Sequence, residues 1–230
     1  RFRTKAAAQD GAVAIRHGAR EVSFAGLLAQ AGGWARMLPA AAGERVVVAG
    51  RNSADLAAAV PGIWARGAIP VFVHADAPDA HLDHALRQTG AVAVLVDPGR
   101  EVAGYGAAVL PLQPADPAES GPVPEQSGQE PGSIVFTSGS TGAPKGVVQA
   151  AETLAGGVDR VAAALGFRAD DSILCPVPFA FDYGWGQLLS LLLAGLPLVQ
   201  PEPRSAAGLC AAIASHRPTI LAGVPAVFAD

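Results

Sequence analysis

Lysine is the scarcest charged residue of this chain. Among 230 residues, two lysines, Lys5 and Lys145, stand beside fourteen arginines, and 20 acidic residues outnumber the 16 basic ones. The net charge of −4 and the single, scattered arginines exclude the basic surface with which nucleic-acid-binding proteins meet phosphates, so we expect no nucleic-acid partner. A lysine kept inside a chain that otherwise uses arginine needs an explanation.

Cysteines and long hydrophobic runs are also scarce. The two cysteines, Cys175 and Cys210, cannot form a disulfide framework, which predicts a reducing, cytoplasmic location and core positions for both thiols. No apolar stretch reaches the roughly 18 to 20 residues that a membrane-spanning helix needs, so we expect no membrane span. The chain begins with Arg1 and lacks a signal-peptide pattern, so we expect it to be a piece of a longer protein.

The chain has a globular composition, half of it hydrophobic, in which short apolar runs alternate with segments of helical periodicity. The alternation predicts an α/β fold with layered, parallel-rich sheets, flanking helices and right-handed crossovers. Asn52 or Ser53 is a candidate cap for one of the helices. The elements that carry this prediction are strands over 45–49, 69–73 and 92–96, and helices over 53–66 and 78–88.

A stretch rich in Pro, Gly and Glu, residues 111–132, separates two parts of the chain. It lacks periodicity, which is typical of a surface connection. We therefore expect a first α/β subdomain over 1–110 and a second over 133–230. The second is predicted to contain strands over 133–136, 172–175, 196–199 and 219–221, and helices over 152–165, 186–193 and 206–215.

Most of the chemistry lies in the decapeptide TSGSTGAPKG, which directly follows a predicted strand. Its glycines let the backbone approach a ligand, its hydroxyls can donate to phosphate oxygens, and Lys145 is a mobile point charge. The pattern is neither the common P-loop nor a nucleophile elbow. It predicts a phosphate-binding loop formed by Thr137, Ser138, Gly139, Ser140, Thr141, Gly142, Lys145 and Gly146.

The decapeptide resembles the phosphate-binding signature of the AMP-forming adenylating enzymes, which include acyl-CoA synthetases, nonribosomal-peptide adenylation domains and luciferases. Weaker landmarks occur in the family's order, so the resemblance covers essentially the whole chain. They are SFAGL at 23–27, WARGAIPV at 64–71, FDYG at 181–184, PTIL at 218–221 and VP at 224–225. One departure is the sequence VVQA after Gly146, where the family has a histidine.

The resemblance implies an enzyme that activates a carboxylic acid with ATP and Mg²⁺, forms an acyl-adenylate and releases pyrophosphate. The acyl group then passes to the thiol of CoA or of a carrier-protein phosphopantetheine. It also implies that the loop holds the β- and γ-phosphates and that Lys145 is the catalytic cation. Positioning and charge stabilisation should dominate this phosphoryl-type substitution.

For the acid itself, the resemblance implies a pocket lined by Asp182, Tyr183, Gly186 and Ala222. Asp182 is similar to the aspartate that pairs with the α-amino group in amino-acid-activating members, so an amino or imino acid is an alternative to a plain carboxylic acid. A buried carboxylate is costly without such a cation. In a purely structural interpretation, Asp182 caps a helix that begins at Gly184–Trp185.

The chain lacks several elements of the family, including the motif that holds adenine and Mg²⁺ and the mobile C-terminal domain. We therefore expect it to bind nucleotide poorly alone, and a non-catalytic binding module that keeps only this half of the fold is a second alternative. The sequence assigns no metal ligand. Its densest polar cluster reads as a solvated loop and helix start: His74, Asp76, Asp79, His81, Asp83 and His84.

Overall fold

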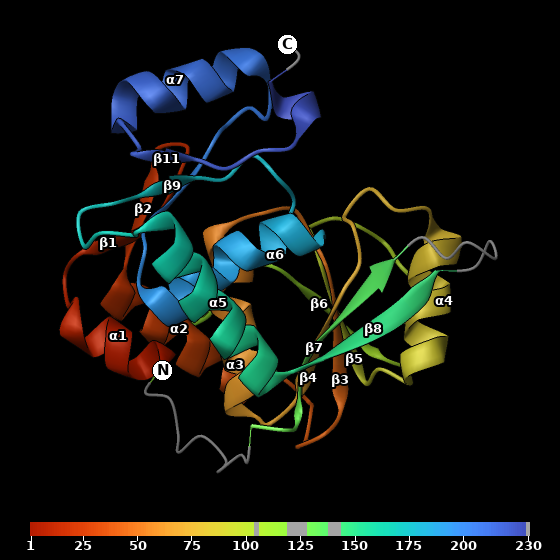
Figure 1. Cartoon of the computed structure of the whole chain (residues 1–230). Helices are drawn as coiled ribbons and strands as arrows, with labels where there is room; N and C mark the ends of the chain where they lie inside the picture. Colours follow the sequence, from red (N-terminus) through yellow and green to blue (C-terminus); the bar gives the residue numbers. More distant parts are fainter. Residues whose placement is uncertain (104–105, 119–127, 138–143, 229–230) are drawn as a thin grey trace. The chain divides into compact units, whose positions relative to one another are not determined.

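The computed structural model describes residues 1–103, 106–118, 128–137 and 144–228 (Figure 1). The chain forms two compact units, each discontinuous in sequence and each holding one sheet. The first unit contains residues 1–27, 52–54 and 155–230, and the second contains residues 28–51 and 55–154. The chain therefore passes between the units four times, after residues 27, 51, 54 and 154.

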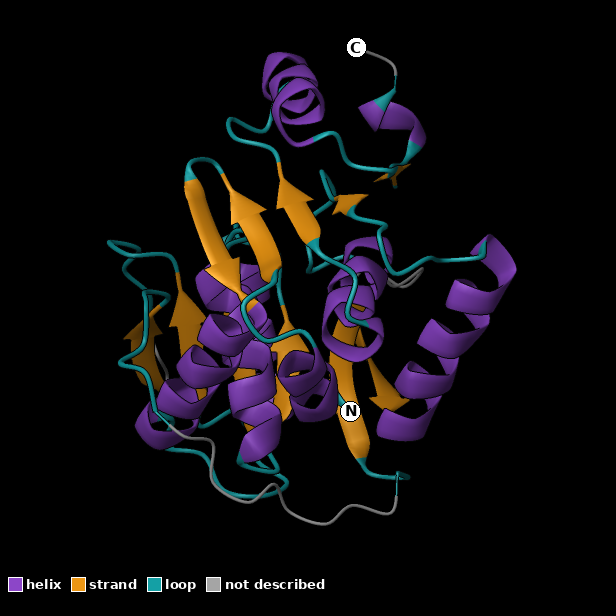
Figure 2. Cartoon of the chain, turned by 90° about the vertical axis from the view of Figure 1, so that its left-hand side faces the viewer, coloured by secondary structure: helices purple, strands orange, loops and turns teal. Residues whose placement is uncertain are grey.

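The first unit is built on a five-stranded sheet with the order β11-β9-β10-β1-β2. Its neighbouring strands run parallel except in the β1–β2 hairpin, which Figure 2 shows as two orange strands joined by a tight turn. Ile15 pairs with Leu198 at the centre of this sheet, and both side chains are fully buried. The strands are Val13–His17 (β1), Arg20–Ser23 (β2), Ile173–Leu174 (β9), Leu198–Gln200 (β10) and Ile220–Leu221 (β11).

The second unit is built on a six-stranded sheet with the order β6-β5-β3-β4-β7-β8, parallel except for the last pair. Val46 and Val47 of β3 are fully buried, as expected for a parallel strand covered on both faces. Leu82, Ala85 and Leu86 of the helix Asp79–Thr89 (α4) pack against this sheet. The strands are Arg45–Ala49 (β3), Ile69–Phe72 (β4), Ala93–Val96 (β5), Ala108–Pro111 (β6), Pro131–Thr137 (β7) and Lys145–Ala150 (β8).

The helix ends follow familiar capping rules. Gly90 ends α4 in the left-handed region (φ 57°), which a residue without Cβ adopts at little cost, and the hydroxyl of Ser205 accepts from the Gly208 amide at the start of α7. The helices are Phe2–Ala8 (α1), Phe24–Met37 (α2), Ala54–Ala65 (α3), Asp79–Thr89 (α4), Ala151–Leu165 (α5), Asp182–Leu189 (α6) and Ala206–His216 (α7). A π-helical turn over Ser190–Ala194 and a 3-10 turn over Pro225–Val227 complete them.

The predicted fold class is confirmed: both sheets are mostly parallel and carry flanking helices. The β-α-β-α-β alternation between residues 45 and 96 has the predicted order. The apolar segments 12–15 and 21–24 predict the hairpin of β1 and β2, and the helical spacing of apolar residues over 27–38 predicts α2, whereas α1, β6 and β8 were not anticipated from the sequence. In β8, Val147 and Val148 are both exposed, so the strand shows no alternation of buried and exposed residues.

The division of the chain into 1–110, 111–132 and 133–230 stays a prediction. The two compact units are grouped differently, because β7 and β8 complete the sheet of β3–β6, whereas β1 and β2 join the sheet of β9–β11. In the part of the chain that the structure describes, no helix combines the length and the apolar character needed to cross a membrane.

Candidate functional site

The predicted phosphate-binding loop is held at both ends by the hairpin of β7 and β8. Thr137, the last residue of β7, pairs in register with Lys145, the first residue of β8, and the Thr137 hydroxyl donates to the Lys145 carbonyl oxygen at 3.5 Å. The backbone therefore leaves and re-enters the sheet at two facing positions. Ser138, Gly139, Ser140, Thr141 and Gly142 lie outside the described residues.

Lys145 and Gly146 lie at the start of β8, and both are exposed. Among the described residues, no carboxylate forms an ion pair with Lys145. Gly146 pairs with Phe136, and a Cβ at Gly146 would lie 3.1 Å from a methyl carbon of Ile134, so even alanine would be tight here. The sheet edge thus presents an accessible cation on a strand that packs closely against its neighbour.

Sequence reasoning missed a histidine beside this loop. The Nε2 atom of His84, on α4, lies 3.0 Å from the Pro144 carbonyl oxygen, and the imidazole meets the Phe136 ring edge-on, with 6.1 Å between ring centroids. The sequence placed His84 in a solvated polar cluster. No local signal could have separated it from its neighbours, because its partner lies 60 positions further along the chain.

Three of the four predicted acid-pocket residues share one exposed face of α6. Asp182, Tyr183 and Gly186 are exposed, whereas Gly184 and Trp185 are buried. Phe181 occupies the N-cap position and Asp182 is the first helical residue, so the interpretation of Asp182 as the cap of a helix beginning at Gly184–Trp185 is wrong. In the first turn, its carboxylate instead suits the positive end of the helix dipole.

Ala222, the fourth residue, follows β11 and is half-buried. Its backbone N–H donates to the Leu174 carbonyl oxygen at 3.4 Å, so it continues the alignment of β11 beside β9. Among the described residues, it shares no hydrogen bond with α6. The structure thus gathers Asp182, Tyr183 and Gly186 on one helix and places Ala222 at the end of a strand.

The segment that leads into α6 is fixed by a buried side chain that sequence reasoning treated as a helix cap. The Asn52 amide donates to the Val177 carbonyl (2.8 Å) and to the side-chain oxygen of Gln200 (3.1 Å), and its own oxygen accepts from the Phe179 amide (2.7 Å). Asn52 is 5% exposed, so these bonds form away from water. Asn52 therefore sets the path of the chain just before Asp182.

The two cysteines differ in their exposure to solvent. Cys175 is buried, as predicted, and burial raises the pKa of its thiol to about 12, while its Sγ donates to the Val177 carbonyl at 3.5 Å. The prediction of a core position for Cys210 is wrong, because it lies exposed on α7, which buries only Gly208 and Ala212.

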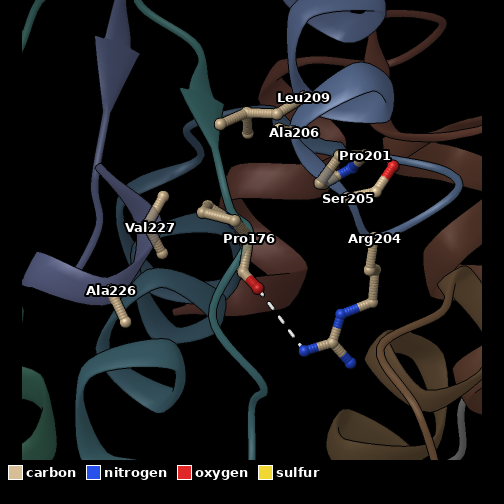
Figure 3. A pocket seen from close by; sticks show the side chains of 8 residues that line it. All are labelled: Pro176, Pro201, Arg204, Ser205, Ala206, Leu209, Ala226 and Val227. Carbon is tan, nitrogen blue, oxygen red and sulfur yellow. Dashed lines mark hydrogen bonds between the residues drawn. The ribbon is translucent and has the colours of Figure 1, made fainter. Parts of the chain in front are cut away.

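A cavity of about 180 Å³ lies beside α7 in the first unit (Figure 3). Leu209 and Pro201 line it, and the Arg204 guanidinium donates to the Pro176 carbonyl at 3.4 Å. None of the predicted site residues lines it. Within the described ranges, no group of three His, Cys, Asp or Glu side chains gathers in a way that could hold a metal ion.

The fold is that of the N-terminal subdomain of adenylate-forming enzymes. Bacillus subtilis o-succinylbenzoate CoA synthetase superimposes on 99% of this chain with a TM-score of 0.89 and 21% identity, and this chain covers 62% of it. That enzyme has been solved with its acyl-adenylate intermediate and with ATP and a magnesium ion. The nonribosomal peptide synthetase FmoA3 matches 95% of this chain (TM-score 0.85, 23% identity), which covers 24% of it.

The chain belongs to the AMP-binding enzyme family, which it matches over residues 2–230. A curated relative, the Anguibactin system regulator of Vibrio anguillarum, is 28% identical over 242 aligned residues. The match covers 99% of this chain and 23% of that relative, so the chain spans about a quarter of the relative's length.

Proposed function

We propose that the protein activates a carboxylic acid with ATP, forming an acyl-adenylate and pyrophosphate, and then transfers the acyl group to the thiol of CoA or of a carrier-protein phosphopantetheine. One observation carries the proposal: the Ser/Thr/Gly-rich segment ending in Lys145 is held between the paired ends of β7 and β8. Membership of the AMP-binding family supports the proposal.

The first half-reaction uses the loop as a binding site for the leaving group. A carboxylate oxygen of the acid bonds to the α-phosphorus of ATP, and the bond from that phosphorus to the pyrophosphate oxygen breaks. The hydroxyls of Thr137, Ser138, Ser140 and Thr141 and the backbone at Gly139, Gly142 and Gly146 would bind the β- and γ-phosphates. Lys145 would neutralise the charge that develops on pyrophosphate. Mg²⁺ would enter with ATP, and we assign it no ligand in this chain.

The exposed face of α6 would line the acid site, with Ala222 as a further wall. Tyr183 and Gly186 would contact the side chain of the acid, and the open space at Gly186 would leave room for it. The amino- or imino-acid alternative rests on the resemblance of Asp182 to the aspartate of amino-acid-activating members. The cost of a buried carboxylate does not apply to Asp182, because it is exposed on this face, where it could still pair with an ammonium group.

The two lysines provide a matched experiment in the natural protein that contains this chain. Lys145→Ala should slow acid-dependent ATP–pyrophosphate exchange by about 10²- to 10³-fold, the loss typical of removing one group that stabilises developing charge. Thioester formation from supplied acyl-adenylate should change far less. Lys5→Ala, in α1, is the control and should match the wild type in both reactions. Equal losses in both half-reactions would contradict the role of Lys145.

A panel of plain and amino acids, assayed with Asp182→Ala, separates the substrate classes. A wild type that exchanges pyrophosphate with amino acids and loses that activity in Asp182→Ala supports the amino-acid alternative. A wild type that exchanges only with plain acids, and does so equally well in Asp182→Ala, supports the main proposal. Failure of the wild type to exchange pyrophosphate with any acid would favour the non-catalytic binding module.

A further inference from the structure

His84 lies at the junction of three elements of the second unit. It projects from α4, meets Phe136 near the end of β7 and contacts Pro144 just before β8. The neighbouring α4 residues Leu82 and Ala85 are buried in the core of this unit, so the backbone that carries His84 is firmly seated. The imidazole is therefore a side chain on a fixed support that reaches the end of the phosphate-binding segment.

The chemistry of the two groups determines which of them donates the hydrogen bond. A carbonyl oxygen only accepts hydrogen bonds, so the Nε2 atom of His84 must carry a proton and donate to Pro144. Pro144 has no N–H, and the β7–β8 pairing ends at Thr137 and Lys145. Among the described residues, the imidazole is therefore the only hydrogen-bond partner of Pro144.

We propose that His84 is a positioning residue for the phosphate-binding segment. By holding the Pro144 carbonyl, it would fix the backbone immediately before Lys145 and so aim the lysine at the phosphates. The hairpin pairing holds the segment at Thr137 and Lys145, and His84 adds a third anchor from a different element. This inference rests on the proposed function, because it gives His84 a role in binding ATP.

Two substitutions separate the hydrogen bond from the packing. His84→Phe keeps an aromatic ring against Phe136 but removes the donor, whereas His84→Gln keeps an N–H donor of similar reach. Because one hydrogen bond contributes about 0.5–1.5 kcal/mol, His84→Phe should raise the KM for ATP in pyrophosphate exchange about 2- to 13-fold and leave the KM for the acid unchanged. His84→Gln should have a KM for ATP close to that of the wild type.

The ATP dissociation constant, measured by calorimetry without acid, should rise by the same factor in His84→Phe. The matched controls are His81→Phe and His81→Gln, because His81 is exposed on the same helix. Thermal unfolding midpoints identify variants that merely fold poorly, and such a variant would lower the active fraction without shifting KM.

The outcomes separate failure of the proposed function from failure of the role of His84. A wild-type protein without acid-dependent exchange overturns the proposed function. An active wild type whose KM and dissociation constant for ATP match those of His84→Phe overturns the role of His84. Equal increases in the KM for ATP and for the acid would also overturn it, because that pattern indicates a general disturbance of the fold.

Discussion

At the scale of single residues, Asn52 is the clearest case of a side chain whose hydrogen bonds organise a distant segment. Its amide joins Val177, Phe179 and Gln200, which lie 125 to 148 positions away. The sequence predicts Asn52 as a helix cap, because asparagine is a preferred N-cap residue before an apolar helical run. No feature within a few residues of Asn52 could have identified these partners.

Asn52→Ala should lower the free energy of unfolding by about 2–4 kcal/mol, because it leaves the buried amide of Phe179 without its acceptor and removes a donor from the Val177 carbonyl and from the Gln200 side chain. Urea denaturation of the variant and the wild type measures the difference. Gln88→Ala, at an exposed position of α4, is the control and should stay within about 0.5 kcal/mol. An Asn52→Ala variant as stable as this control would contradict the account.

The two thiols should react very differently. With a pKa of about 12, buried Cys175 remains protonated at pH 8, and the thiolate is the nucleophilic form. We expect iodoacetamide to modify Cys210 in the native protein and both cysteines after unfolding, as measured by mass spectrometry of the peptides. Rapid modification of native Cys175 would show that its surroundings open readily.

At the scale of elements, α6 combines two glycines with opposite surroundings. A methyl group at Gly184 would overlap the Pro178 carbonyl group, with 2.6 Å between the added carbon and the carbonyl carbon, whereas nothing lies within 4 Å of the same position at Gly186. One glycine allows close packing, and the other leaves open the face that we assign to the acid.

Gly184→Ala should therefore destabilise the protein by about 1–3 kcal/mol through overpacking. Gly186→Ala should stabilise it by up to about 1 kcal/mol, because alanine favours helix. Urea denaturation tests both effects. In the same proteins, Gly186→Ala should reduce exchange with bulky acids more than with small ones. Similar stability changes in the two variants would count against the packing described for α6.

The elements that the sequence predicted well are those that bury a continuous apolar run. The strands β3, β4 and β5 could be predicted from such runs, because central parallel strands are covered on both faces and are therefore apolar along their length. In contrast, β8 begins with an exposed lysine and two exposed valines, and its strand conformation comes from pairing with β7. The proposed phosphate-binding residues were predicted from the residue types of the decapeptide, whereas the pairing of Thr137 with Lys145 at its two ends is a property of the hairpin that the decapeptide does not reveal.

At the scale of the whole chain, each unit is assembled from segments far apart in sequence. Ile15 pairs with Leu198 across 183 positions, and Val71 pairs with Ile134 across the Pro/Gly-rich connection. Sequence composition predicts that connection but carries no information on which strands pair across it. This is why the division at residues 110 and 133 does not coincide with the two units.

Expressing residues 133–230 alone tests whether the predicted second subdomain folds without the rest of the chain. In that fragment β10 lacks its partner β1, and β7 lacks its partner β4. We expect no cooperative thermal transition by near-ultraviolet circular dichroism, whereas residues 1–230 should show one. A sharp transition in the fragment would support the proposed subdomain boundary at residue 133.

The exposed start of β8 also makes the protein convenient for chemical footprinting. Because Lys5 and Lys145 are the only lysines of this chain and both are exposed, an amine-selective acylating reagent has two side-chain targets, one in each unit. Lys5 can then serve as an internal reference while the acylation rate of Lys145 reports ligand binding at the proposed phosphate-binding segment. Because lysine is so scarce in this chain, few other side chains compete for the reagent, and the acylation of Lys145 can be measured directly.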